Sequence, residues 1–152
     1  MILTILCGSP GSGKTTLSKK LAEETNATRY SFDELGCLKH DELIAPIVRS
    51  LLDGEDVVVD ALYVCLTTRQ TLLKAISHID CKRVLLYMDT SLEECIRRNA
   101  QRQRPLSSEF VKGIYNSIQL PTLSEGWDEI IYMKEFNMDE SILNSIKTHN
   151  EN

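Results

Sequence analysis

Short apolar runs alternate along this chain with longer segments in which apolar residues recur every three or four positions. The short runs, rich in valine, isoleucine and leucine, are typical of strands buried on both faces of a parallel sheet. The second spacing places apolar side chains on one face of a helix. We expect strands at 1–7, 28–31, 57–60, 84–88 and 126–132. We expect helices at 14–25, 46–53, 67–79, 91–104, 108–119 and 139–148.

This alternation of strands and helices predicts an α/β domain with three layers, a mainly parallel sheet between helices, and right-handed crossovers. The 152 residues are expected to form a single domain. The carboxyl ends of parallel strands lie at one edge of the sheet, where ligands bind in open α/β folds. Functional residues are therefore expected along that edge.

A glycine-rich segment, GSPGSGKT at 8–15, follows the first predicted strand and opens the first helix. It fits G-x-x-x-x-G-K-[ST], the phosphate-binding P-loop. Glycines let successive backbone N–H groups line an anion nest, and the next helix directs its positive end at the same phosphates. The Lys14 ammonium is expected to reach the β- and γ-phosphates, and the Thr15 hydroxyl to face Mg²⁺. The residues expected to bind the nucleotide are Gly8, Ser9, Pro10, Gly11, Ser12, Gly13, Lys14, Thr15 and Thr16.

Two carboxylates follow strands at the predicted ligand edge. Asp33 lies where Ser31 and Glu34 have capping-box spacing, and it is a candidate general base. A charge at a helix N-terminus is the alternative interpretation of Asp33. Asp60 closes a run of valines, and with Thr15 it is the expected metal-binding pair. A turn-forming aspartate is the alternative for Asp60.

Four arginines lie within eight residues, 97–104, at the end of a predicted helix, although the chain has a net charge of −5. Arg98 and Arg102 are four residues apart and share a helix face. Planar guanidinium groups suit phosphoryl oxygens, whereas cations favoured at a helix C-terminus are the alternative interpretation. Arg69 lies in the first turn of another predicted helix, against the dipole preference, and an exposed arginine is its simplest interpretation.

The acidic composition argues against a broad nucleic-acid-binding surface but is compatible with a narrow basic channel. No apolar run approaches the ~20 residues of a membrane span, and the first residues lack the pattern of a signal peptide. Five cysteines are spaced singly, which indicates reduced thiols and a cytoplasmic protein. Cys7, Cys65 and Cys95 lie in apolar patterns and are expected in the core.

Together these motifs resemble the P-loop kinases of the phage polynucleotide 5′-hydroxyl kinase type over nearly the whole chain. The resemblance rests on the loop at 8–15, SFDE at 31–34, VDA at 59–61, RNAQR at 98–102 and EGWDEII at 125–131. It implies ATP and Mg²⁺ as cofactors, a strand order of 2-3-1-4-5, and a lid at about 98–120. It also implies that Asp33 is the general base and that Lys14, Arg98 and Arg102 stabilise the transferred phosphoryl group. The chain departs from the family at Gly36, where an acceptor-binding arginine is usual, and Lys39 or His40 are the candidate substitutes.

The expected function is ATP-dependent transfer of the γ-phosphate to a hydroxyl, with the 5′-hydroxyl of DNA or RNA as the leading acceptor. One alternative is a kinase of small molecules, either nucleosides, nucleotides or sugar-like acceptors, which the acidic charge favours slightly. Another is a kinase of hydroxymethylated bases in DNA. A nucleotide-binding switch without transfer is the third, and the candidate base Asp33 weighs against it.

Overall fold

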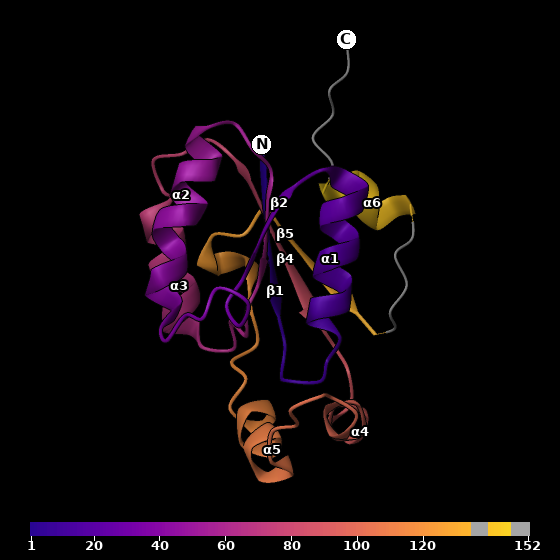
Figure 1. The fold of residues 1–152 in the computed structure, drawn as a ribbon. Helices are drawn as coiled ribbons and strands as arrows, with labels where there is room; N and C mark the ends of the chain where they lie inside the picture. Colours follow the sequence, from indigo (N-terminus) through magenta and orange to yellow (C-terminus); the bar gives the residue numbers. More distant parts are fainter. Residues whose placement is uncertain (135–139, 147–152) are drawn as a thin grey trace.

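Five parallel strands form one sheet in the computed structural model, which describes residues 1–134 and 140–146 (Figure 1). The strands are β1 (Ile2–Cys7), β2 (Thr28–Ser31), β3 (Val57–Asp60), β4 (Lys82–Met88) and β5 (Glu129–Met133). Their order is β2-β3-β1-β4-β5, and every neighbouring pair is parallel. The predicted fold class and strand order are therefore confirmed.

Helices cover both faces of this sheet. They are α1 (Lys14–Thr25), α2 (Ile44–Leu52), α3 (Leu66–Ala75), α4 (Leu92–Ala100), α5 (Ser108–Asn116) and α6 (Glu140–Ile146). Two short 3₁₀ helices, η1 (His40–Leu43) and η2 (Leu123–Glu125), complete the described elements. Figure 1 shows α1 and α6 on one face, α2 and α3 on the other, and α4 and α5 beyond the carboxyl edge.

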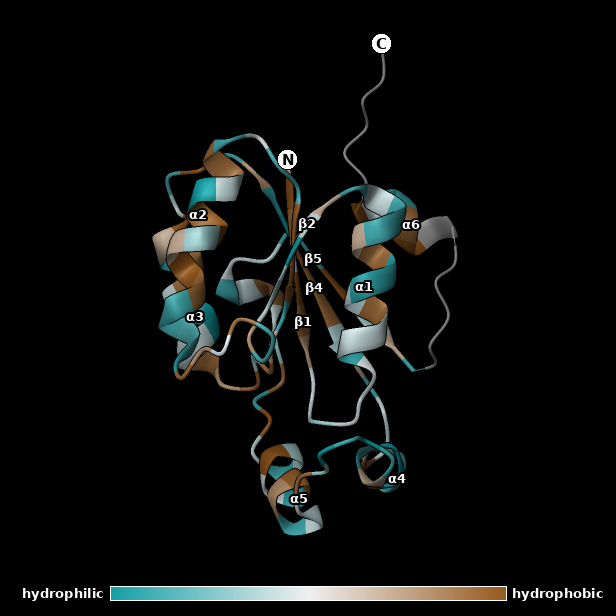
Figure 2. Ribbon diagram, viewed as in Figure 1, coloured by the Kyte–Doolittle hydropathy of each residue, from teal (hydrophilic) through white to brown (hydrophobic). Residues whose placement is uncertain are grey.

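The core consists of two apolar layers, one on each face of the sheet (Figure 2). Successive residues of β1 point to opposite faces, as the pleat requires. Leu3 and Ile5 therefore pack toward α2 and α3, while Ile2 and Leu6 pack toward α1. All six residues of β1 are buried, which agrees with the continuous apolar run that predicted this strand.

Several predicted boundaries differ from the structure. The helix predicted at 67–79 begins at Leu66 and ends at Ala75. The residue at its cap is Cys65, which is exposed, so the prediction that Cys65 lies in the core is wrong. The predicted final helix is observed at Glu140–Ile146, and the predicted positions 139, 147 and 148 lie outside the described residues.

A side-chain cap begins α4, because the Ser91 hydroxyl accepts a hydrogen bond from the Glu94 N–H at 3.2 Å. The prediction that Cys7 and Cys95 lie in the core is confirmed, since both are buried, and all five cysteines are free thiols. Within 1–134 and 140–146, no helix has the length and apolar content that crossing a bilayer requires.

Candidate active site

The phosphate loop turns between β1 and α1 through two glycines with left-handed backbones. Gly11 has φ of 81° and Gly13 has φ of 100°, values that other residues rarely adopt. Gly11 also lies against the backbone of α4, and a Cβ at this position would be 2.2 Å from the Cys95 carbonyl oxygen. The glycine at position 11 therefore permits both the turn and the contact between the loop and α4.

Lys14 is buried, with its side chain folded over this loop. Its ammonium donates to the Ser9 carbonyl oxygen at 2.7 Å and lies 3.4 Å from the Ser12 hydroxyl. Burial lowers the pKa of Lys14 to about 8, and the nearby Asp60 carboxylate opposes that shift. Arg102 contributes a smaller lowering, so its charge lies within electrostatic reach of Lys14.

We expect nucleotide affinity to fall as the pH rises above about 8, because Lys14 then loses its proton in the free protein. The charged form is the one that attracts phosphates, so the loss approaches tenfold for each further pH unit, of order 1.4 kcal/mol. Titration with a fluorescent ATP analogue from about pH 7 to about pH 9.5 measures this dependence. Lys14→Met should bind weakly at every pH, and the same slope in that variant would contradict the assignment.

Thr15 at the start of α1 lies against Asp60 at the end of β3. The Thr15 hydroxyl donates to Asp60 Oδ2 at 2.9 Å, and the Asp60 side chain is buried. These hard oxygen donors suit Mg²⁺, which is held by one or two protein groups together with nucleotide phosphates. The described part of the chain contains no group of three or more histidine, cysteine, aspartate or glutamate residues that could hold a metal alone. The residues therefore fit a cation that arrives with a nucleotide.

Asp33 is exposed in the turn that follows β2. The preceding Phe32 N–H donates to the Asp60 carbonyl oxygen at 3.0 Å, which fastens this turn beside the Thr15–Asp60 pair. The Glu34 N–H donates to the Ser31 hydroxyl at 3.3 Å, as the capping-box spacing predicts. The segment forms a hydrogen-bonded turn rather than a helix. The residues 32–39, here called the acceptor loop after their predicted role, thus begin next to the predicted metal pair.

Helix α4 and the residue Thr90 just before it pack directly on the phosphate loop. The Ser9 hydroxyl donates to Cys95 Sγ at 3.2 Å, and the Thr90 hydroxyl donates to the Ser12 carbonyl oxygen at 3.1 Å. Arg98 Nη1 donates to the same Ser12 oxygen at 3.3 Å. Arg98 is therefore held against the loop that the sequence predicts to bind phosphate.

Arg102 lies in the exposed connection between α4 and α5. The Asn99 side chain closes this connection, because its amide donates to the Leu106 carbonyl at 2.7 Å and accepts from the Leu106 N–H at 3.2 Å. Arg98 and Arg102 thus occupy different surroundings, one in contact with the loop and the other at a solvent-facing turn.

His40 does not suit the role of a cation that binds an acceptor. Its ring lies 5.0 Å from the Phe32 ring and 5.0 Å from the Tyr63 ring. Burial lowers the pKa of His40 below its ordinary value, and the nearby Asp41 opposes this only in part. Burial thus disfavours the charged form of His40, and the exposed Lys39 is the cation of the acceptor loop.

Arg29 in β2 is a polar residue of the site that the sequence pattern did not indicate. Its Nη2 donates to Asp60 Oδ2 at 2.9 Å, its Nε donates to the Ser18 hydroxyl at 2.8 Å, and its Nη1 donates to Glu34 Oε2. The hydrogen bond from Arg29 holds the pKa of Glu34 below its ordinary value. The sequence did offer one sign of this role, a positively charged residue inside a four-residue strand. That strand ends beside Asp60.

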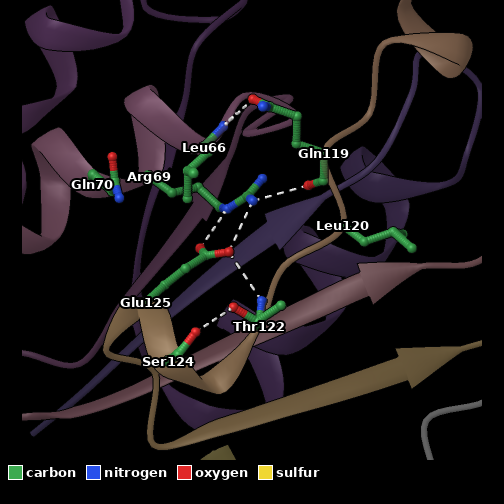
Figure 3. A pocket seen from close by; sticks show the side chains of 8 residues that line it. All are labelled: Leu66, Arg69, Gln70, Gln119, Leu120, Thr122, Ser124 and Glu125. Carbon is green, nitrogen blue, oxygen red and sulfur yellow. Dashed lines mark hydrogen bonds and ion pairs between the residues drawn. The ribbon is translucent and has the colours of Figure 1, made fainter.

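Arg69 is fully buried, so the prediction of an exposed arginine is wrong. Figure 3 shows its guanidinium against Glu125 and the backbone of Gln119. Arg69 donates to both carboxylate oxygens of Glu125, at 2.8 and 3.0 Å, and to the carbonyl oxygens of Tyr63 and Gln119, at 2.8 and 2.9 Å. Burial would raise the pKa of Glu125, but the hydrogen bond from Arg69 and others hold it below its ordinary value. Arg69 therefore joins α3 to the segment that returns from α5.

The parallel sheet and the phosphate loop at its carboxyl edge define a kinase-like P-loop NTP-binding domain. Residues 3–115 match the model of the AAA domain family, and the chain belongs to that family.

Individual relatives agree with this class. L-seryl-tRNA(Sec) kinase of Methanococcus maripaludis is 28% identical in an alignment 171 positions long, which covers 99% of this chain and 67% of that protein. The structure of Chaetomium thermophilum Kti12 in complex with ADP-AlF3 matches with a TM-score of 0.72 at 15% identity, over 95% of this chain and 94% of that one. A fungal RNA kinase matches with a TM-score of 0.68 at 20% identity, over 95% of this chain and 41% of that one. The two structural matches show that the fold is shared.

Proposed function

We propose that this protein transfers the γ-phosphoryl group of ATP to a hydroxyl, with the 5′-hydroxyl of DNA or RNA as the leading acceptor. The observation that carries the proposal is the double contact of Asp60. Its carboxylate accepts from Thr15 next to the phosphate loop, and its carbonyl oxygen accepts from Phe32 next to Asp33. The predicted nucleotide-binding loop and the exposed carboxylate of Asp33 therefore lie on either side of Asp60. Phosphoryl transfer requires donor and acceptor groups to be held close together in this way.

On the donor side, the loop N–H groups and Lys14 are proposed to bind the ATP phosphates. Arg98, already in contact with the Ser12 carbonyl, is proposed to neutralise charge on the same phosphates. Arg102 is proposed to complete this role when the segment at about 98–120 closes as a lid and excludes water. Thr15 and Asp60 would hold Mg²⁺, which would supply positive charge beside the nucleotide phosphates.

On the acceptor side, Asp33 is proposed to accept the proton of the attacking hydroxyl. Its exposure in the turn after β2 leaves it accessible to an acceptor. Because the transition state of phosphoryl transfer is largely dissociative, positioning and charge stabilisation carry most of the catalysis. A nucleotide switch has no need of such a base, and this disfavours the reading without transfer.

Two of the related proteins carry RNA or tRNA in their names, a kinase of seryl-tRNA and an RNA kinase. This favours a hydroxyl on a nucleic acid, and Lys39 is the residue of the acceptor loop proposed to contact its phosphate. The narrower resemblance to phage polynucleotide kinases stays a prediction.

A small-molecule acceptor is the second candidate, and the charge of the acceptor side favours it. Asp33, Glu34, Asp41 and Glu42 surround the single cation Lys39 in this stretch of sequence. A polyanionic strand would meet repulsion there, whereas a neutral metabolite would not.

Transfer of label from γ-labelled ATP in the presence of Mg²⁺ tests both candidates. The acceptors are 5′-hydroxyl DNA and RNA oligonucleotides, DNA with hydroxymethylated bases, and a panel of nucleosides, nucleotides and sugars. We expect labelled oligonucleotides with the wild type and none with Lys14→Ala, while Arg49→Met, at an exposed site on α2, serves as the matched control. Label on metabolites alone would replace the first candidate by the second. Tight ATP binding with label on no acceptor would contradict both.

A further inference from the structure

Arg29 connects three elements of the site through one rigid group. Its guanidinium contacts Ser18 on α1, Asp60 at the end of β3, and Glu34 in the acceptor loop. The Arg29 side chain is only 13% exposed. Because the guanidinium is planar and its donors are fixed in a fork, displacement of one partner alters its bonds to the others.

We propose that Arg29 is a positioning residue that couples Asp60, the predicted metal-binding carboxylate, to the acceptor loop, so that the loop is held more firmly when Mg·ATP is bound. This inference rests on the proposed function, because it assumes that a nucleotide with its cation binds beside Thr15.

The two carboxylates that share Arg29 differ in their surroundings. The Asp60 side chain is 7% exposed, so removing Arg29 would leave a poorly solvated negative charge on Asp60. The Glu34 side chain is 52% exposed, and solvent screens an ion pair at such a position, so the pair contributes little to stability. Arg29 is therefore anchored at the Asp60 and Ser18 end, and its weak contact is the one to the acceptor loop.

A cation beside Thr15 changes this balance. When Asp60 faces a divalent cation, part of its negative charge is compensated there, and its attraction for Arg29 decreases. Glu34 is then the main anionic partner of Arg29, so the Arg29–Glu34 contact strengthens. The acceptor loop, which carries Asp33 next to Glu34, is held more firmly as a result. The bound nucleotide thus stabilises one conformation of the loop through a difference in contacts.

Hydrogen exchange measured by mass spectrometry tests this coupling without an acceptor. The wild type, Arg29→Met, Glu34→Gln and the control Arg49→Met are compared free, with Mg²⁺ and a non-hydrolysable ATP analogue, and with that analogue and EDTA. In the wild type and Arg49→Met, we expect amides at 32–39 to exchange about tenfold more slowly with Mg²⁺ and analogue, a typical coupling magnitude. In Arg29→Met and Glu34→Gln, this slowing should drop below about twofold, while protection of the phosphate loop at 8–16 remains.

Hydrogen exchange at 8–16 separates a failure of nucleotide binding from a failure of the Arg29 coupling. Absence of protection there in the wild type would overturn nucleotide binding and the coupling together. Two results would overturn the coupling alone, provided that 8–16 is protected. In the first, both variants keep the full slowing of exchange at 32–39. In the second, the wild type shows equal slowing at 32–39 with the analogue and EDTA. If Arg29→Met fails to fold, Glu34→Gln decides the question, because Glu34 is an exposed side chain. Arg29→Lys, which keeps the charge but not the fork, should retain only part of the slowing.

Discussion

Asp33→Asn is expected to lower the rate of phosphoryl transfer by about 10²–10⁴-fold, the usual contribution of a general base. An amide at this position cannot accept the proton of the attacking hydroxyl. ATP affinity should stay within about twofold of the wild type, because Asp33 is exposed in the acceptor loop and lies outside the phosphate loop. Steady-state rates with the acceptor found by the labelling assay, together with ATP-analogue titration, measure both quantities.

Asp53→Asn, an exposed carboxylate just after α2, is the matched control and should transfer phosphate at the wild-type rate. Wild-type rates in Asp33→Asn would refute its role as base. Loss of ATP affinity in that variant would instead assign Asp33 to the donor side.

Arg69→Met is expected to lower the free energy of unfolding by about 3–5 kcal/mol, since breaking a buried ion pair leaves the partner charge uncompensated. Glu125 would lose both hydrogen bonds from the guanidinium, and the Gln119 and Tyr63 carbonyls would each lose one. For a chain of this size, the melting temperature should fall by roughly 6–20 °C. Thermal and urea unfolding measure the loss.

The double variant Arg69→Met/Glu125→Leu tests the origin of this loss. Removing both charges takes away the uncompensated carboxylate. The losses of unfolding free energy in the single variants Arg69→Met and Glu125→Leu should therefore differ in sum from the loss in the double variant, by about 0.5–3 kcal/mol. The double variant should stay below the wild type, because Thr122 and Trp127 also donate to Glu125. Strictly additive losses would show that the pair does not act as a unit.

The sheet was predictable because β1 and β3 are buried, mainly apolar runs, and because a phosphate loop must stand between a strand and a helix. The contact between Thr15 and Asp60 was likewise predictable, since both residues stand at the carboxyl edge of neighbouring strands. Here local sequence and tertiary structure favour the same arrangement.

The burial of Arg69 was not predictable in the same way. Arg69 and Glu125 are 56 positions apart in the sequence, and nothing local indicates that they meet. The misfit of Arg69 with the helix dipole was a sign of a special role, but its partner could come only from the fold. Cys65 was misplaced for a related reason, because an apolar neighbourhood in sequence does not reveal that the residue stands at a helix cap, facing solvent.

The pairing of Arg69 with Glu125 also bears on how this domain can be divided. The region that matches the family model ends at 115, before Gln119 and Glu125. A fragment cut at that point would keep the phosphate loop, Asp33, Asp60 and the arginines of α4. It would nevertheless contain an arginine with no carboxylate to neutralise it inside the fold. Fragments intended for expression should therefore extend past Trp127, and a nascent chain can complete this part of its core only after that residue has been synthesised.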